Sequence, residues 1–111
     1  MIEYSDFTKL DIRVGLIKVC EKIPKSKHLY RLVVDCGEKN MRQIITGISK
    51  FYTSEELVDK KIVVLTNLKP RIIMGLESKG MLLAADFNGE PFLLKIDERN
   101  GKMIPIGSMI K

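Results

Sequence analysis

Residues 67–85 read NLKPRIIMGLESKGMLLAA and link two apolar runs of the chain. The link holds the cations Lys69 and Arg71 and is punctuated by Gly75 and Gly80. Glycine and proline inside a polar link between apolar runs indicate two β-strands joined by a loop. Cationic side chains, backbone amides and a hydroxyl lie close together in this loop, so it carries the groups that hold a phosphate backbone.

The chain before this loop alternates in the way that β-strands do. Apolar side chains recur at every second position of the first segment: Leu10, Ile12, Val14 and Leu16. This period predicts a long first strand over residues 6–21, in which Gly15 marks a bend or bulge. Further strands are predicted over residues 29–36, 41–46, 62–66 and 81–87. The run at 62–66 is apolar on both faces, which indicates a central strand.

One short helix is predicted between the third and fourth strands. Thr53 and Glu56 have the spacing of a capping box, and the helix is expected to end near Asp59. Two-residue hairpin turns, which the Asn-Gly dipeptide favours, are predicted at Asn88-Gly89 and Asn100-Gly101. These turns delimit a strand over 92–96 and a tail over 103–110.

Three strands, a helix and two strands are the element order of an OB-fold. The sequence therefore predicts an all-β protein with one short helix, an OB-fold five-stranded barrel with an added C-terminal hairpin region. We expect residues 1–111 to form a single domain. Its barrel is expected at about 8–87 and its extension at about 88–111.

The composition is that of a soluble globular protein, with 45% hydrophobic and 30% charged residues. The first residues have acidic side chains and no apolar stretch, unlike a secretory signal. No apolar run approaches the length needed to cross a bilayer. We expect a cytoplasmic protein without a membrane partner.

The positive charge lies in the middle of the chain. Residues 22–80 hold 12 Lys or Arg against 6 Asp or Glu, whereas the remaining residues hold 7 against 8. This asymmetry favours a polyanionic partner such as a nucleic acid, although solvation alone could also account for a modest excess.

Little in the sequence points to catalysis. Cys20 and Cys36 are the only cysteines and are expected to be reduced thiols; with His28 they lack the close ligand pair of a zinc site. The glycines of the loop have the spacing of a phosphate-binding P-loop, but Met81 and Leu82 stand where Lys and Ser or Thr are required. We expect a binding module without enzymatic activity, metal or cofactor.

Four stretches of the chain resemble the tRNA-binding domain family, whose members occur as stand-alone proteins, at the C-terminus of bacterial methionyl-tRNA synthetases and in a cytokine-like subunit of animal synthetase complexes. The stretches are DFTKLDIRVG at 6–15, RQIITGI at 42–48, FYTSEEL at 51–57 and the whole of 67–85, the most specific signature. The resemblance implies an OB-fold that binds tRNA by its shape. It also implies a non-catalytic role, in which the domain recruits or retains tRNA as an auxiliary or β subunit of a methionyl-tRNA synthetase.

The resemblance further implies a set of tRNA-binding residues. Within the signature these are Asn67, Lys69, Arg71, Ser78 and Met81. Lys27 and Arg31 flank the same face, and Arg42 opens the matching RQIITGI stretch. The turn KSKHL at 25–29 lacks the aspartate of the usual family pattern H-P-x-A-D-K-L. The rigid Pro70 keeps Lys69 and Arg71 apart, and only Arg71 can pair bidentately with a phosphate.

Several of these residues also have a purely structural explanation. Ser78 could cap the turn before Gly80, Met81 could belong to the core, and Asn67 could satisfy its own backbone. Lys69 and Arg71 could be a solvated loop pair.

The resemblance implies a homodimer formed through the C-terminal region. The apolar residues of this region are Phe92, Leu93, Leu94, Ile96, Met103, Ile104, Ile106, Met109 and Ile110. So many apolar side chains must be buried against the barrel or across a two-fold axis. Two other functions remain open: an export-type chaperone that binds unfolded peptides on the same fold, and a scaffold subunit that docks on a synthetase.

Overall fold

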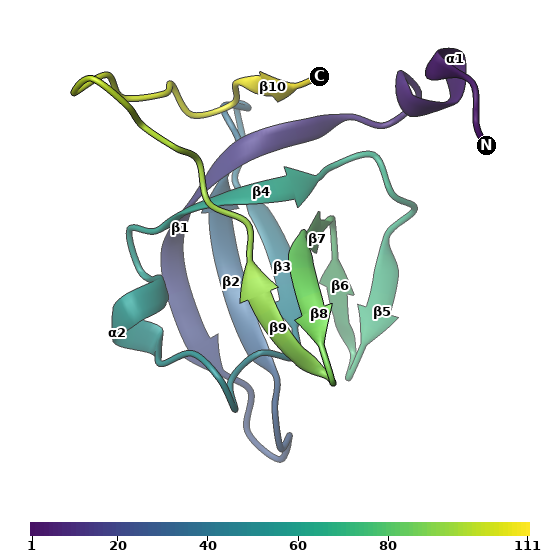
Figure 1. The fold of residues 1–111 in the computed structure, drawn as a ribbon. Coiled ribbons are helices and arrows are strands. Elements are labelled where there is room, and N and C mark those ends of the chain that lie inside the picture. Colours follow the sequence, from purple (N-terminus) through teal and green to yellow (C-terminus); the bar gives the residue numbers. More distant parts are fainter.

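Five antiparallel strands curve into a nearly closed barrel in the computed structural model, which describes residues 1–111 (Figure 1). Their order is β3-β2-β1-β4-β7. The strands are β1 (Ile12–Lys22), β2 (Tyr30–Asp35), β3 (Arg42–Thr46), β4 (Lys61–Leu65) and β7 (Met81–Leu82). The helix α2 (Ser54–Leu57) lies between β3 and β4 in the chain. This arrangement is OB-like, as the sequence predicts.

The barrel interior holds most of the core. Its fully buried side chains are Ile17, Leu32, Val34, Ile44, Leu57, Ile62 and Val64, each less than 2% exposed. Leu57 comes from α2 and is 0% exposed, so this single helical turn seals the barrel with one apolar side chain. Burying a side chain of this size stabilises the fold by about 1.5–3 kcal/mol.

β4 is buried on both faces, which confirms its predicted central place. Ile62 and Val64 face the barrel interior, whereas Val63 and Leu65 belong to a second, outer cluster with Ile12. Since Ile12 pairs with Leu65 on the neighbouring strand, the predicted apolar stripe of β1 faces this outer layer at Ile12 and not the barrel interior, whereas Leu10 precedes the strand and is exposed. The side chains that cover that layer come from the N-terminal segment, from the link between β7 and β8 and from the C-terminal extension: Phe7, Leu83, Ile96 and Ile110.

Gly15 lies on the interior side of β1, paired with Ile62. A Cβ there would be 2.9 Å from Val34 Cγ1 and 3.1 Å from Val64 Cγ2, so the position has no room for a side chain. The predicted irregularity of the strand is real but lies further along, because the register with β2 shifts between Ile17 and Val19. Gly15 is needed for packing, and the bulge follows it.

The predicted capping box of α2 is confirmed. Thr53 Oγ1 accepts a hydrogen bond from Glu56 N at 3.2 Å, and Glu56 Oε1 accepts one from Thr53 N at 2.7 Å. The prediction that the first strand starts at residue 6 is wrong, because a helix α1 (Tyr4–Phe7) occupies its beginning. Asp6 supplies the reason, since its carboxylate accepts from Glu3 N at 3.1 Å and caps that turn. Neither helix has the length and apolar character that a bilayer crossing requires.

The predicted loop between the last barrel strands contains a hairpin of its own. Its strands are β5 (Arg71–Ile73) and β6 (Leu76–Ser78), which pair in an antiparallel sheet. Met74 and Gly75 form the turn with φ of +50° and +78°. A positive φ is rare for methionine, so the dipeptide gave no hairpin signal of the Asn-Gly kind.

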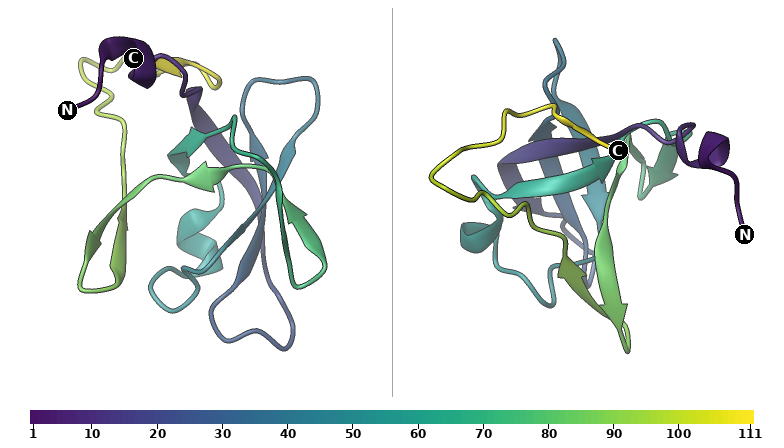
Figure 2. Two further views of the ribbon diagram at one scale, coloured as in Figure 1. Left: turned by 90° about the vertical axis from the view of Figure 1, so that its right-hand side faces the viewer. Right: turned by 45° about the horizontal axis from the view of Figure 1, so that its top comes forward.

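The predicted turn at Asn88-Gly89 is confirmed. Both residues have positive φ, 52° and 86°, and they join β8 (Ala84–Phe87) to β9 (Glu90–Leu93). The strand predicted over 81–87 is therefore divided between β7 in the barrel and β8 in this separate hairpin. Figure 2 shows the β8–β9 hairpin and the β5–β6 hairpin projecting from opposite sides of the barrel.

The C-terminal extension only partly follows the prediction. Asn100-Gly101 forms a turn, with Lys102 N donating to Arg99 O at 3.1 Å, but the next strand is only the short β10 (Met109–Ile110). This tail pairs with β1 where β2 has ended: Gly107 N donates to Val14 O at 2.8 Å, and Val14 N to Ser108 O at 2.9 Å. The last residues thus complete the sheet around the first strand.

Candidate nucleic-acid interface

The β5–β6 hairpin and its flanks close the barrel by lying along the free edge of β3. Lys79 N donates a hydrogen bond to Gln43 O at 2.8 Å, and Gln43 Nε2 donates to Glu77 O at 2.9 Å. Ser78 Oγ accepts from Ile45 N at 3.0 Å. The loop between β4 and β7, residues 66–80, is called the signature loop below. These bonds hold it as an ordered element against the sheet.

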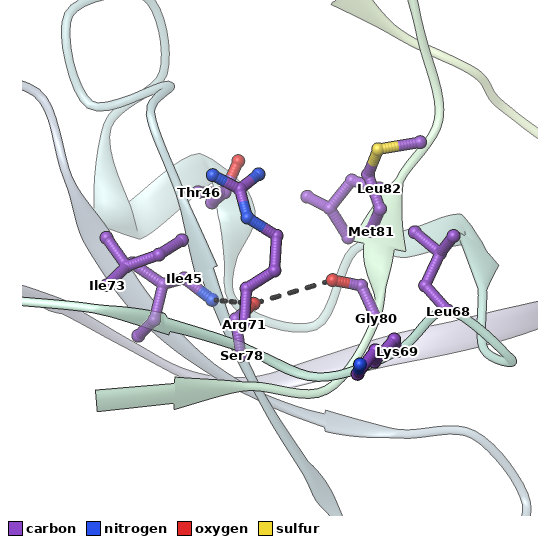
Figure 3. Close-up of a pocket in the computed structure, with 10 residues that line it drawn as sticks. All are labelled: Ile45, Thr46, Leu68, Lys69, Arg71, Ile73, Ser78, Gly80, Met81 and Leu82. Carbon is purple, nitrogen blue, oxygen red and sulfur yellow. Dashed lines mark hydrogen bonds between the residues drawn. The ribbon is translucent and has the colours of Figure 1, made fainter. Parts of the chain in front are cut away.

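A small pocket of about 110 Å³ lies where this loop meets β3 (Figure 3). Lys69 and Arg71 supply its cationic lining. The other side chains and backbone that line it come from Ile45, Thr46, Leu68, Ile73, Ser78, Gly80, Met81 and Leu82. Four residues that the family resemblance implies for tRNA contact, Lys69, Arg71, Ser78 and Met81, are thus brought together around one cavity.

Lys69 and Arg71 are exposed, and neither forms an ion pair with a carboxylate. Arg71 pairs with Ser78 across the hairpin, and Figure 3 shows its side chain extending between Ile73 and Met81. Two cations without a counterion beside an open pocket attract an anion, and the guanidinium can bind a phosphate bidentately.

Ser78 and Met81 differ in their degree of burial. Ser78 is only 7% exposed, and its hydroxyl accepts from Ile45 N and points to Gly80 O at 3.5 Å. Met81 is 46% exposed, so its side chain lies at the surface and not in the core. Met81 is therefore accessible to a ligand, whereas the hydroxyl of Ser78 is already used to join β6 to β3.

Asn67 anchors the start of the chain. Its side-chain Oδ1 accepts from Asp11 N at 2.9 Å, and its Nδ2 donates to Lys9 O at 2.7 Å. The expected alternative, that Asn67 satisfies its own backbone, is wrong, because its partners are 56 and 58 residues away in the sequence. Its amide group holds the entrance of the loop against the segment before β1.

The arginines of β2 and β3, Arg31 and Arg42, are engaged with carboxylates. Arg31 donates to Glu21 Oε1 at 2.6 Å and to Gln43 Oε1 at 2.7 Å. Arg42 donates to both carboxylate oxygens of Glu38, at 2.6 and 2.8 Å. The hydrogen bond from Arg42 lowers the pKa of the Glu38 carboxyl, and the same bond raises the pKa of Arg42. Both guanidinium groups are thus less available to a phosphate than Arg71.

Lys27 lies in the exposed turn between β1 and β2, without an ion pair. This turn is closed without the aspartate of the family pattern: Ser26 Oγ donates to Ile23 O at 2.7 Å, and Ile23 N donates to Leu29 O at 3.1 Å. In OB-folds, oligonucleotides bind the face of strands 2 and 3 and the loops between strands 1 and 2 and between strands 4 and 5. Lys27 occupies the first of these loops, and the signature occupies the second.

Gln43 has a role that the sequence did not reveal. It lies on β3 and contacts both Arg31 and the backbone of β6, so it joins the strand face to the signature loop. No local pattern predicts this role, because the two partners are 12 and 34 residues away.

The acidic, cysteine and histidine side chains of the chain do not form a cluster of the metal-binding kind. No group of three or more His, Cys, Asp or Glu side chains is placed to hold an ion. Cys20 and Cys36 are free thiols, and burial raises the pKa of each to about 11.

The family comparison agrees with this geometry. The sequence model of the family described as "Putative tRNA binding domain" matches residues 12–103. This chain belongs to that family. The match spans the barrel, the signature loop and the β8–β9 hairpin, so every element that lines the pocket belongs to the tRNA-binding domain.

The sequence and the fold of this chain are similar to those of a methionine–tRNA ligase and of a MetRS-related protein. This chain is 56% identical over 88 residues to the methionine–tRNA ligase of Methanosarcina acetivorans, a match that covers 79% of this chain and 12% of the ligase. The chain thus spans about an eighth of that relative's length. The crystal structure of a MetRS-related protein from Pyrococcus horikoshii is similar over 100% of this chain and 98% of that one, with 37% identity and a TM-score of 0.89.

A second solved structure has a different described role. The CsaA chaperone protein from Picrophilus torridus is similar over 100% of both chains, with 30% identity and a TM-score of 0.87. Both solved structures share the tRNA-binding domain's fold over its whole length.

Proposed function

We propose that this domain recruits or retains tRNA, without catalysis, in support of a methionyl-tRNA synthetase. The observation that carries the proposal is that Lys69 and Arg71 line one pocket, on the loop that OB-folds use for nucleic acids. Both side chains are exposed and have no counterion. The kinship with a methionine–tRNA ligase supports the link to that enzyme. We propose a cytoplasmic location on the same grounds.

Phosphate contacts position an RNA, and they carry no sequence information by themselves. The pocket is lined by two cations without counterions and by no aromatic side chain, since Phe51 and Tyr52 lie on the other loop between β3 and α2. This composition suits recognition of the folded shape of tRNA better than stacking of single-stranded bases.

The test is binding of purified protein to bulk folded tRNA at several salt concentrations, with duplex RNA and an unfolded polypeptide as competitors. We expect preference for tRNA and a log–log salt slope of about −2 to −4, from a handful of phosphate contacts. Arg71→Ala and Lys69→Ala should each weaken binding, Arg71→Ala by about 1–3 kcal/mol because it can make charge-assisted hydrogen bonds.

Lys102→Ala is the matched control, since Lys102 is exposed in the C-terminal extension and forms no ion pair. It should leave affinity nearly unchanged. Equal losses for Lys102→Ala and Lys69→Ala would mean that only net charge matters. Absence of any tRNA preference in the unmodified protein would refute the proposed function.

We also propose a homodimer formed through the C-terminal region. Of its apolar residues, Phe92, Leu94, Met103 and Met109 remain exposed, whereas Leu93, Ile96, Ile104, Ile106 and Ile110 are partly covered. Met103, at 77% exposure, lines a cavity of about 440 Å³ with Val58 and Leu94. Sedimentation velocity over a range of concentrations tests the dimer. Met103→Asp should shift the species to monomer if this face is the interface.

A chaperone that binds unfolded peptides is the second candidate. The likeness to the CsaA chaperone protein favours it, and so do the exposed apolar side chains of the two projecting hairpins: Ile72, Met74, Phe87 and Phe92. Peptide binding through apolar contacts would be insensitive to salt and to Arg71→Ala. The competition assay above therefore separates the two functions.

A further inference from the structure

One guanidinium lies at the neck of the signature loop. Arg42 Nη1 donates to Thr66 O at 3.0 Å and to Lys79 O at 2.9 Å. Thr66 is the residue that follows β4, and Lys79 is the residue that follows β6. The two ends of the loop are therefore bonded to the same nitrogen atom of Arg42. All five signature residues with an implied RNA contact lie inside this neck or within two residues of it.

The charge of Arg42 is already neutralised. Glu38 accepts from Arg42 Nε at 2.6 Å and from Arg42 Nη2 at 2.8 Å, which is a bidentate pair. The side chain of Arg42 is only 21% exposed. Four of its N–H donors are thus in use, and a phosphate would have to displace Glu38 to reach them.

We infer that Arg42 is a positioning residue of the tRNA interface: it holds the two ends of the signature loop together and does not contact the RNA. The inference rests on the proposed tRNA function. It assigns Arg42 a role that differs from the direct contact implied by the family resemblance. Glu38 has a share in this role, because its carboxylate fixes the plane of the guanidinium.

The barrel itself does not depend on this neck. Thr66 N donates to Asp11 O at 2.8 Å, and Lys79 N donates to Gln43 O at 2.8 Å, both between backbone groups. Substitution of Arg42 should therefore leave the sheet paired. What changes is the distance between the ends of the loop and, with it, the placement of Lys69 and Arg71 relative to each other.

The experiment measures tRNA affinity against salt for the unmodified protein, Arg42→Gln, Glu38→Gln and Arg71→Ala. A residue that contacts phosphate contributes about 0.7–0.9 to the magnitude of the negative log–log slope. Arg71→Ala should therefore make the salt dependence shallower by that amount. Arg42→Gln should weaken binding by about 2- to 10-fold, the effect of a lost hydrogen bond, with the slope unchanged. A shallower salt dependence for Arg42→Gln, or unchanged affinity, would overturn the inference.

Glu38→Gln gives a second readout, because the two possible roles of Arg42 predict opposite changes in tRNA affinity. If Arg42 contacted phosphate, release from Glu38 would strengthen tRNA binding. If Arg42 positions the loop, loss of its bidentate pair with Glu38 should weaken binding. Strengthened or unchanged binding would overturn the inference, and this arm remains informative even if Arg42→Gln fails to fold.

One control variant and one NMR measurement distinguish the possible failures. Arg99→Gln removes the same charge from an exposed arginine whose side chain has no partner, so it reports the effect of net charge alone. The backbone amide NMR signals of Lys79 and Asn67 should shift in Arg42→Gln but not in Arg99→Gln. Absence of tRNA preference in the unmodified protein would refute the proposed function, whereas a normal Arg71→Ala effect with an unaffected Arg42→Gln would refute only the inference about Arg42.

Discussion

Ser78 and Ile45 are joined by a hydrogen bond that crosses from β6 to β3. The backbone N–H of Ile45 donates to Ser78 Oγ at 3.0 Å, and both residues are buried, at 6% and 7% exposure. A side chain here takes the place of the backbone carbonyl that an ordinary strand partner would supply. The edge of β3 is thus satisfied by a hydroxyl of the signature loop.

Ser78→Ala should lower the free energy of unfolding by about 1–3 kcal/mol, because the buried N–H of Ile45 would lose its acceptor. Urea denaturation followed by circular dichroism measures this change. Ser5→Ala, at an exposed serine in α1, is the control and should have an effect within about 0.5 kcal/mol. A loss below that size for Ser78→Ala would show that water replaces the hydroxyl.

Gly37→Ala should destabilise the protein more than Gly101→Ala does. Both glycines have positive φ, 78° and 68°, so both substitutions impose similar backbone strain. Only at Gly37 would the new Cβ be 2.8 Å from Gly107 Cα, whereas nothing lies within 4 Å at Gly101. We expect the difference to be about 1–3 kcal/mol in urea denaturation, with faster hydrogen exchange at Gly107 N. Equal effects would mean that the tail moves aside freely.

Stability should fall as the pH drops below about 5. The hydrogen bond from Thr66 lowers the pKa of Asp11, and the hydrogen bond from Arg42 lowers the pKa of Glu38. A carboxyl whose pKa is lower in the folded state stabilises the fold fully above its unfolded pKa. This stabilisation is lost as pH falls through the folded pKa.

Denaturation midpoints measured between pH 7 and pH 2 test this dependence. Asp11→Asn and Glu38→Gln should each flatten the profile at its acidic end, whereas Glu3→Gln, at an exposed residue that forms no ion pair, should leave it unchanged. A profile that Asp11→Asn does not alter would assign the acid sensitivity to other groups.

Both thiols should react slowly with iodoacetamide in the folded protein. With a pKa of about 11 for Cys20 and for Cys36, the thiolate fraction at pH 8 is about one in a thousand. Intact-mass spectrometry should show slow labelling in buffer and complete labelling in urea. We expect Cys20 to react before Cys36, because Cys36 is buried and Cys20 only partly so. Rapid labelling of Cys36 would contradict the packing of the barrel end.

The sequence predicts those parts of the fold that are written in local patterns. The capping box at Thr53 and the Asn88-Gly89 turn each depend on residues a few positions apart, and both are confirmed. The alternation in β1 is confirmed only at Ile12 and Val14, because Leu10 precedes the strand and Leu16 is only partly buried. The Met74-Gly75 turn was missed because methionine rarely adopts positive φ.

The candidate site was predictable in its residue types more than in its connections. Lys69 and Arg71 stood out through their charge and their place in the loop. The bonds of Asn67 to Asp11 and of Arg42 to Thr66 span 56 and 24 residues, and no periodicity links such positions. Polar residues that serve the backbone and polar residues that face solvent have the same appearance in a sequence.

The pairing of β1 with the last residues has a consequence for how the protein is made. The N-terminal half of β1 lies between β4 on one side and the segment 107–110 on the other. During synthesis on the ribosome, that side of β1 stays open until residues 107–110 have emerged, although the rest of the barrel can already have formed. An open strand edge is a template for pairing with other chains. Nascent chains of this protein therefore have a vulnerable interval, which closes only when Gly107 reaches Val14.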